Sequence, residues 1–452
     1  MAATRDAESQ ALTFLTDLVA KARKAGADAA DAVAVEGVSL SVSQRLGARE
    51  DLQRSESRDL GLRVFVGKKS ATVSATDRSP QAVAELVERA VAMARLAPED
   101  PYAGLADPAL LARSLPDLDL CDDAEPDAER LYGKAAQAED VARNVPGITN
   151  SEGADASWGR STVALATSHG FAGSYSGSRH SVSVSVIAGE GTAMERDYDF
   201  TSARHEGDLD EPARLGRNAA EKALKRLNPR RMASGQFPII FDPRVSNGLL
   251  GHLAGAVNGQ SVARKTSFLR EARGTQVFAP GVTVIDDPHR KRGQASRPVD
   301  GEGVATQPLT LIDNGMLTGW ILDSASAHQL GLQTTGHASR GTSGPPGPST
   351  SNLYMQAGKL SPRDLMADIG SGFYVTELIG FGVNGVTGDY SRGAAGFWIE
   401  NGTVSFPANE ITIAGNLKDM FRQLTPASDL VFRYGTNAPT VRIDGMTIAG
   451  AG

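Results

Sequence analysis

Two hydrophobic periodicities alternate along the first half of the chain, one typical of helices and the other of strands. Apolar residues recur every three to four positions in four segments, which we predict to be helices: 11–25, 80–94, 127–144 and 211–227. Between them apolar and polar residues alternate, most clearly at Val182, Val184 and Val186, as in half-buried strands. The order helix, two hairpins, helix occurs over residues 1–97 and again over 127–229, which indicates a duplicated unit. Coincidence of common elements is the alternative.

The two units are separated by residues 97–126, which are rich in Pro, Asp and Ala and which we expect to form a linker on the surface. Pro229 follows the fourth helical segment and indicates the main boundary of the chain. We therefore predict two regions, an N-terminal α/β region over residues 1–229 and a C-terminal region over 230–452.

The C-terminal region has short apolar runs between glycines, at residues 237–241, 309–312, 374–381, 411–414 and 441–443. Helices are expected from Asn247 onward, near Asp364 and over residues 417–424. Short strands of this kind favour a closed or nearly closed sheet, since closure removes exposed edges. The predicted fold class is α+β, with the duplicated helix–hairpins–helix region followed by a strand-rich, barrel-like domain.

Length and composition limit the choice of function. The chain has 452 residues, of which 40% are hydrophobic, enough for two or three domains. Its formal net charge of −7 argues against a nucleic-acid binder, whose affinity depends on neutralising phosphates. We interpret the basic run at residues 289–292 as a solvated loop. A single cysteine, Cys121, excludes an internal disulfide, and neither a signal peptide nor a long apolar span is evident, so we expect a cytoplasmic protein without membrane contact.

The most informative segment is NGLLGHLAGAVNGQSVARKTSFL, residues 247–269. A zinc-peptidase helix carries two histidines that bind the metal and a glutamate that takes a proton from the metal-bound water. This segment has a helical pattern but only one histidine, His252, and no acidic residue before Glu271. The pattern therefore indicates a metallopeptidase helix without its metal ligands.

This segment, together with residues 286–320 and 376–402, resembles the TldD/PmbA (TldE) family, historically called modulators of DNA gyrase. In that family the TldD branch carries an HExxxH helix and a downstream cysteine, and the TldE/PmbA branch lacks both. Alignment from Arg264-Lys265 without gaps places Gly251 and Ala256 at the histidine positions. A shift of one residue makes His252 the first ligand but places Val257 at the second. The chain is thus similar to the TldE/PmbA branch.

The resemblance implies that this chain has no catalytic or metal-binding residues and binds no cofactor itself. Zinc is expected in a TldD-type partner, with which the chain would form a heterodimer that processes or degrades unfolded peptides and small proteins. It also allows a homodimer when the chain is expressed alone.

Nine residues are candidates for lining a cavity or contacting peptide: His252, Asn258, Arg264, Lys265, Arg297, Asp300, Glu302, Ser391 and Arg392. The Asp300-Gly301-Glu302-Gly303 turn brings two carboxylates close enough for acid–base work, although we favour a structural turn. Arg392, in a segment between two glycines, is expected on a constrained loop, where it clamps a peptide carbonyl or carboxylate or forms a buried ion pair.

Two further readings of the sequence remain. One is a self-sufficient hydrolase that uses His252 with Asp300 and Glu302. The other is a homo-oligomeric peptide-binding or regulatory protein. A dinucleotide site at residues 380–385, which match GxGxxG, is rejected because the following residues are not helical. The Gly/Pro/Ser segment 339–351 has the length of a mobile lid, and disorder without function is equally compatible with it.

Overall fold

The computed structural model describes residues 2–450, with side chains described from Glu8 onward. The two N-terminal units have the same order of elements. The first contains α1 (Ala2–Lys24), β1 (Ala29–Arg45), β2 (Ala48–Val66), β3 (Lys69–Ala75) and α2 (Pro80–Leu96). The second contains α3 (Ala128–Arg143), β4 (Ile148–Thr167), β5 (Ala172–Ala188), β6 (Glu195–Ala203) and α4 (Pro212–Lys225). The four predicted helices are confirmed, and in each unit the two hairpins share the middle strand.

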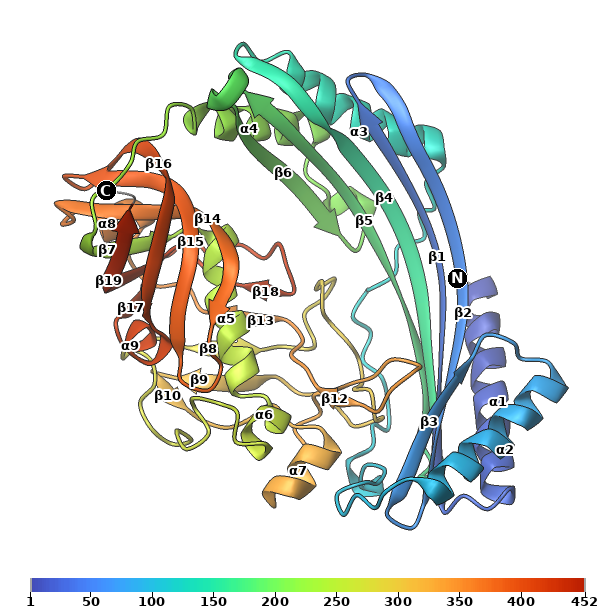
Figure 1. Ribbon diagram of the computed structural model, residues 1–452. Coiled ribbons are helices and arrows are strands. Elements are labelled where there is room, and N and C mark those ends of the chain that lie inside the picture. Colours follow the sequence, from blue (N-terminus) through green and yellow to red (C-terminus); the bar gives the residue numbers. More distant parts are fainter. Residues whose placement is uncertain (1, 451–452) are drawn as a thin grey trace.

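The two units join into one antiparallel sheet of order β3-β2-β1-β4-β5-β6 (Figure 1). Strands β1 and β4 pair along most of their length, from Asp31 opposite Thr167 to Gln44 opposite Ala154. The helices cover opposite ends of this sheet, so a single long strand serves two hydrophobic cores. Residues at the start of β1 pack with α1 and α2, while Leu40 and Val42 pack with α3 and α4.

The segment between the units, residues 97–126, does not simply follow the surface as predicted. Leu118 and Leu120 are buried. The Leu118 carbonyl accepts a hydrogen bond from the Arg292 amide, and the Leu120 carbonyl accepts one from the Ser178 amide. The segment therefore lies between the two halves of the molecule and bonds to both. Most of the segment is exposed or half-buried, and it departs from the predicted surface course at these leucines, whose partners are distant in sequence.

The C-terminal half begins with β7 (Gly235–Phe241), α5 (Pro243–Ala256) and α6 (Gly259–Ala263). Five strands then form a closed barrel: β7, β14 (Ser371–Val383), β15 (Asp389–Glu400), β16 (Thr403–Asn416) and β19 (Val441–Gly450). Pairing of β16 with β19 closes the ring, and β17 (Leu424–Pro426) extends it beside β19. The predicted barrel-like α+β fold is confirmed.

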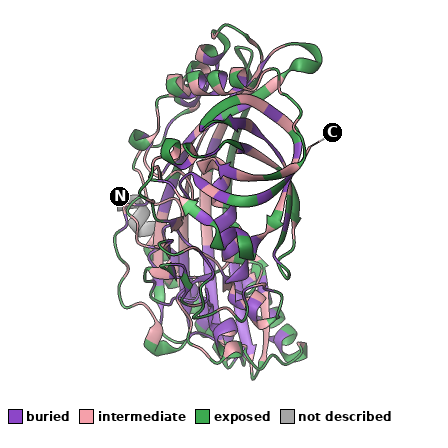
Figure 2. Ribbon diagram, turned by 90° about the vertical axis from the view of Figure 1, so that its left-hand side faces the viewer, coloured by how far each residue is buried: buried purple, intermediate pink, exposed green. Residues whose placement is uncertain are grey.

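A second, five-stranded sheet packs beside the barrel with the order β10-β9-β8-β13-β18. Its strands are β8 (Val284–Asp286), β9 (Leu309–Asp313), β10 (Met316–Leu317), β13 (Leu353–Met355) and β18 (Thr436–Asn437). The remaining elements are α7 (Ser324–Leu330), β11 (Ala338–Ser339), β12 (Gly347–Pro348), α8 (Pro362–Met366), α9 (Leu417–Arg422) and short 3-10 turns at Pro108–Leu110, Gly191–Ala193 and Glu206–Asp208. Buried residues concentrate along the strands and on the inner face of α5 (Figure 2).

None of the helices in residues 2–450 combines the length and hydropathy needed to cross a bilayer.

The segment between β11 and β12 connects the C-terminal half to the long sheet. Its Arg340 side chain is buried and lies 2.6 Å from the carboxylate of Asp31 on β1, which also binds Arg63 of β2 at 2.5 Å. Beside it the backbone of Thr342 packs directly on Gly61, where an added Cβ would lie 2.3 Å from the Thr342 carbonyl oxygen. Residues 339–351, whose length suggested a mobile lid, are thus anchored near their start by the buried charge of Arg340 and by the close backbone contact of Thr342 with Gly61.

Asp31→Ala is expected to lower the free energy of unfolding by about 3–5 kcal/mol, because it leaves two buried guanidinium groups without their carboxylate. Urea denaturation followed by circular dichroism measures the change. The control is Glu129→Ala, which removes an exposed ion pair with Arg49 and should leave the midpoint unchanged. Equal effects of the two substitutions would contradict this account of the junction.

Candidate functional site

The nine candidate residues do not converge. The structure distributes them over three places: beside α5 and β15 (His252, Ser391, Arg392), around the β11–β12 segment (Asn258, Arg297, Asp300, Glu302), and on the surface after α6 (Arg264, Lys265).

Helix α5 begins at Asp242, whose carboxylate accepts a hydrogen bond from the Arg244 amide and so satisfies a free donor of the first turn. Leu249, Leu250 and Leu253 fix one face of the helix in the C-terminal core. On another face the half-buried ring of His252 meets Tyr390 edge-on, with centroids 5.9 Å apart. Burial, and then the Arg392 guanidinium, hold the pKa of His252 below its usual value, which favours a neutral imidazole.

Arg392 lies within strand β15 and not on the constrained loop that its neighbouring glycines suggest. Its guanidinium Nε donates to the carbonyl of Ile379, and its charge lies 6.0 Å from the ring centroid of Phe381. No carboxylate among the described residues pairs with it, so the buried ion pair is absent from this part of the structure. Ser391, its neighbour, is exposed.

Asp300 and Glu302 form a buried turn whose carboxylates are occupied by backbone donors. Asp300 accepts hydrogen bonds from the amides of Glu302, Val304 and Ala338. Glu302 accepts one from the Ser324 amide and lies 3.9 Å from Arg63. Burial and the neighbouring Glu302 raise the pKa of Asp300 to about 7. These contacts are those of a structural turn that holds the β11–β12 segment.

Arg297 and Asn258 also contact the β11–β12 segment. Arg297 donates to the carbonyls of Ala338 and Ser349, at the two ends of that segment. Asn258 caps α6 and donates to the Pro348 carbonyl. Both side chains therefore position backbone. Arg264 and Lys265 are exposed at the end of α6, and Lys265 has a positive φ of 61°.

The principal cavity, of about 780 Å³, lies elsewhere, between the barrel and the end of the long sheet. Its walls come from β6, α4, the start of α5, strands β14 to β16 and the segment before β18: Asp197, Tyr198, Asp199, Phe200, Lys222, Lys225, Asp242, Pro243, Arg244, Tyr374, Thr376, Phe397, Val404, Ser405, Pro407, Asp429, Val431, Arg433, Tyr434, Asn437 and Ala438. None of the nine candidates is among them. No motif indicates this cavity, because its residues come from separate stretches of the chain.

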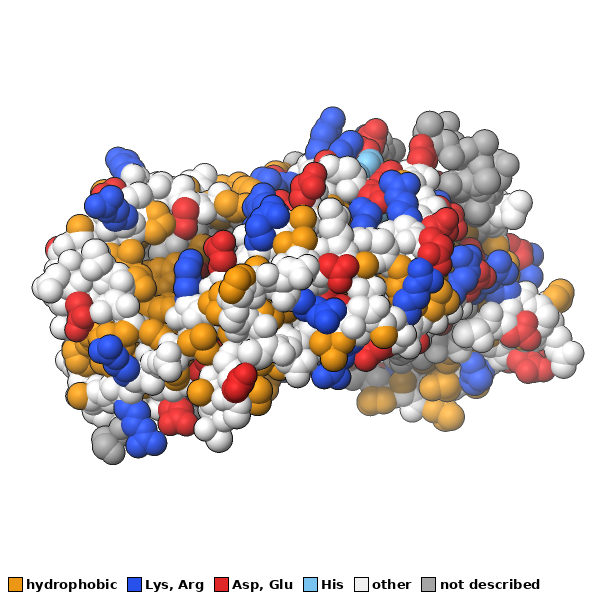
Figure 3. Space-filling model, turned by 90° about the horizontal axis from the view of Figure 1, so that it is seen from above, with side chains coloured by type: hydrophobic (Ala, Val, Ile, Leu, Met, Phe, Trp, Pro, Cys, Tyr) orange, Lys and Arg blue, Asp and Glu red, His pale blue; other side chains and the backbone are white. Residues whose placement is uncertain are grey.

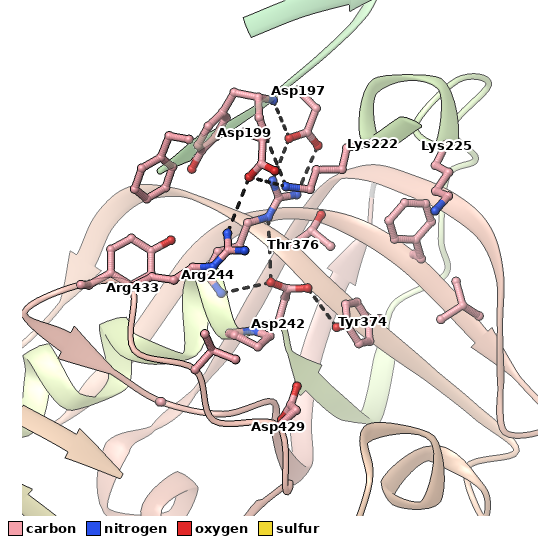
Figure 4. A pocket seen from close by; sticks show the side chains of 18 of the residues that line it. Asp197, Asp199, Lys222, Lys225, Asp242, Arg244, Tyr374, Thr376, Asp429 and Arg433 are labelled. Atoms are coloured by element: carbon pink, nitrogen blue, oxygen red, sulfur yellow. Dashed lines mark hydrogen bonds and ion pairs between the residues drawn. The ribbon is translucent and has the colours of Figure 1, made fainter. Parts of the chain in front are cut away.

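Ion pairs fix one wall of the cavity (Figure 4). Arg244 binds Asp197 through two hydrogen bonds of 2.7 and 3.2 Å and so ties α5 to β6. The arginine holds the pKa of Asp197 below its usual value, although burial alone would raise it. On another wall of the cavity, the Tyr374 hydroxyl donates a hydrogen bond of 2.9 Å to the Asp242 carboxylate. Burial, followed by the carboxylate of Asp242, raises the pKa of Tyr374 well above its usual value, so the phenol remains protonated.

The family models described as PmbA/TldA metallopeptidase domain 1, central domain and C-terminal domain match residues 30–94, 121–227 and 234–450. The Metalloprotease PmbA of Escherichia coli O157:H7 is 41% identical over 94% of this chain and 92% of its own length.

The chain belongs to the PmbA/TldD metallopeptidase family.

Two further comparisons show weaker likeness. A Metalloprotease TldD homolog of Haemophilus influenzae is 25% identical over 52% of this chain and 53% of its own length. The solved structure of TldE from Thermococcus kodakarensis covers 97% of this chain and 100% of its own, with a TM-score of 0.87 and 22% identity, a likeness that shows the shared fold. The PmbA relative thus matches nearly twice as much of the chain as the TldD homolog.

A metallopeptidase family implies a zinc site, and the donors of α5 do not fit one. The two alignments place Ala256 or Val257 at the second ligand position, and both residues are buried in the hydrophobic core. Among the side chains that the structure describes, from Glu8 to Gly450, no three or more of His, Cys, Asp or Glu come together in a way that could hold a metal ion. His252 packs on Tyr390, with no other imidazole beside it.

The raised pKa of Asp300 predicts a pH dependence of stability. The native state keeps a proton that the unfolded chain, with an ordinary pKa of 3.8, has released by about pH 5. Wild-type protein should therefore lose stability relative to Asp300→Asn as pH rises from about 5 to about 7, and the difference should then level off. Urea denaturation of both proteins at a series of pH values measures this. Parallel profiles would show that Asp300 carries no such proton.

Proposed function

We propose that this chain is the TldE/PmbA-type subunit of a cytoplasmic, two-chain zinc metallopeptidase whose TldD-type partner holds the metal. The observation that carries the proposal is the composition of α5. The family's helix is retained and packed in the core, but the alignments assign either Gly251 and Ala256 or His252 and Val257 to the ligand positions, so neither supplies two imidazoles. The substrates are unfolded peptides and small proteins, in keeping with the metalloprotease name of the relatives.

The end of the β14–β15 hairpin supports a protein partner. Ile379, Phe381 and Val386 are exposed there by 59, 98 and 51%. Exposed apolar side chains that gather in one place are typical of protein interfaces. Ile379 and Phe381 lie on β14 and Val386 in the turn that leads to β15, the strand that carries Tyr390 and Arg392, the neighbours of His252. A partner bound here would be close to α5, where its metal helix and this chain could enclose one cavity.

The surface charge agrees with a protein or peptide partner and not with nucleic acid. On the face seen in Figure 3, basic and acidic side chains are interspersed and form no continuous basic surface. The formal net charge of −7 points the same way.

A self-sufficient hydrolase receives no support from the geometry. It requires His252 to act with Asp300 and Glu302, but both carboxylates are buried and accept hydrogen bonds from backbone amides. A homodimer of the isolated chain remains compatible with the apolar hairpin end, because the same surface can pair with a second copy.

Metal analysis separates the two chains. We expect the complex with a TldD-type chain to contain about one zinc per heterodimer and this chain alone to contain none, since its α5 lacks a ligand pair. His252→Ala in this chain should leave the zinc content and peptide cleavage of the complex within about twofold of wild type.

The matched control replaces the first histidine of the partner's HExxxH helix with alanine, which should remove both zinc and cleavage. Stoichiometric zinc in this chain alone would contradict the proposed division of roles. Loss of zinc from the complex on His252→Ala would contradict it as well.

A further inference from the structure

The 780 Å³ cavity between β6, α4 and the barrel has the size of a ligand site, and it touches the metallopeptidase helix only at its start, through Asp242, Pro243 and Arg244. Aromatic and aliphatic side chains make up about half of its lining residues. Tyr198 stacks near Phe200, and the Phe200 and Tyr434 rings lie 5.5 Å apart. Of its lining residues, Tyr198, Val404 and Val431 are 41, 46 and 61% exposed. The cavity thus opens to solvent through apolar side chains.

Charges of both signs surround this apolar lining. In Figure 4 Lys222 and Lys225 of α4 lie above the cavity, while Asp242 and Asp429 lie below it. Lys222 is paired with Asp199 at 3.0 Å, but in the described part of the chain no carboxylate pairs with Lys225. Both sets of charges are close to the same apolar walls.

This distribution selects the chemistry of the ligand. A compact anion would meet Asp242 and Asp429, and a compact cation would meet Lys225 and Arg433. A peptide avoids both penalties. It offers an apolar side chain to the walls, carbonyl acceptors and amide donors to the polar groups, and no net charge in its backbone.

We propose that this cavity is a subsite for an unfolded peptide, in which an aromatic or large aliphatic side chain enters between Tyr198, Tyr434 and Val404. The inference rests on the proposed function for the role of the peptide as substrate. Lys225 and Arg433 contact its carbonyl oxygens or acidic side chains. Peptide held here is bound by this chain and not by the metal-bearing partner, which makes this chain a determinant of substrate choice.

The probe is a short, unstructured, fluorescein-labelled peptide with a central Phe flanked by one Lys and one Glu, and its twin has Ala in place of Phe. Fluorescence anisotropy with the purified chain measures both affinities. We expect the Phe peptide to bind about tenfold more tightly than the Ala peptide, because a buried aromatic ring contributes more than a methyl group.

Two variants fill the cavity from its exposed rim, Val404→Trp and Val431→Trp. Each should remove the preference for Phe and weaken binding of the Phe peptide about tenfold. The matched control is Leu52→Trp, a comparably exposed apolar residue on β2, outside both the cavity and the β14–β15 hairpin, which should retain both affinities. Denaturation midpoints equal to that of the wild type establish that the variants are folded. If Val404→Trp does not fold, Val431→Trp alone tests the inference.

Unchanged affinity in both cavity variants, equal binding of the two peptides, or no binding by the wild-type chain overturns the inference. It is also overturned if the cavity variants abolish assembly with a TldD-type chain but leave peptide binding intact, since the cavity is then a subunit interface. The proposed function is tested separately, by zinc content and cleavage in the assembled pair. A pair that neither binds zinc nor cleaves would remove the proposed function, while the binding results would still decide the cavity.

Discussion

One buried carboxylate determines how the two halves of this molecule meet. Asp31, on the central strand of the long sheet, neutralises both Arg63 from the neighbouring strand and Arg340 from the C-terminal half. A buried charge without its partner is costly, so the segment that carries Arg340 is held where the carboxylate is. Asp300 and Arg297 then hold the ends of the same segment through its backbone. At the other end of the contact between the halves, Arg244 binds Asp197. The principal cavity lies at this second junction.

The chemistry of the chain also depends on which positions are used for packing. Helix α5 is retained as a structural element because Leu249, Leu250 and Leu253 fill the core between the barrel and the second sheet. The helix lacks a pair of imidazoles. Ala256 and Val257, which the two alignments assign to the second metal-ligand position, are both buried and contribute to packing. His252 is left as a neutral ring against Tyr390. We propose that a chain built in this way supplies walls and contacts and leaves bond cleavage to its partner.

Local signals predicted much of the fold from sequence. Helices α2 and α3 were recognisable because apolar residues recur at helical spacing after Ser79 and Asp127, both of which cap their helices in the structure. Four of the five barrel strands, all except β15, were recognisable as short apolar runs. The burial of Leu118 and Leu120 within residues 97–126 was not, since both are held by partners distant in sequence. Arg392 was placed on a loop because its flanking glycines suggested a turn, yet they lie in or beside a strand.

The candidate site was harder to predict than the fold. Motifs identified the family and the helix without ligands, but the principal cavity has no motif. Asp197 and Arg244, which form one of its walls, are 47 positions apart, and only the packing of β6 on α5 brings them together. A sequence motif identifies a site whose residues lie in one short segment. It cannot find a surface assembled from several segments whose residues are individually ordinary.

The central claim is that the metal of this peptidase belongs entirely to the other chain. Anomalous diffraction at the zinc absorption edge, from crystals of the assembled pair, locates the ion directly. The account predicts one peak, surrounded only by side chains of the TldD-type subunit. A peak coordinated by His252 or any other side chain of this chain would contradict it.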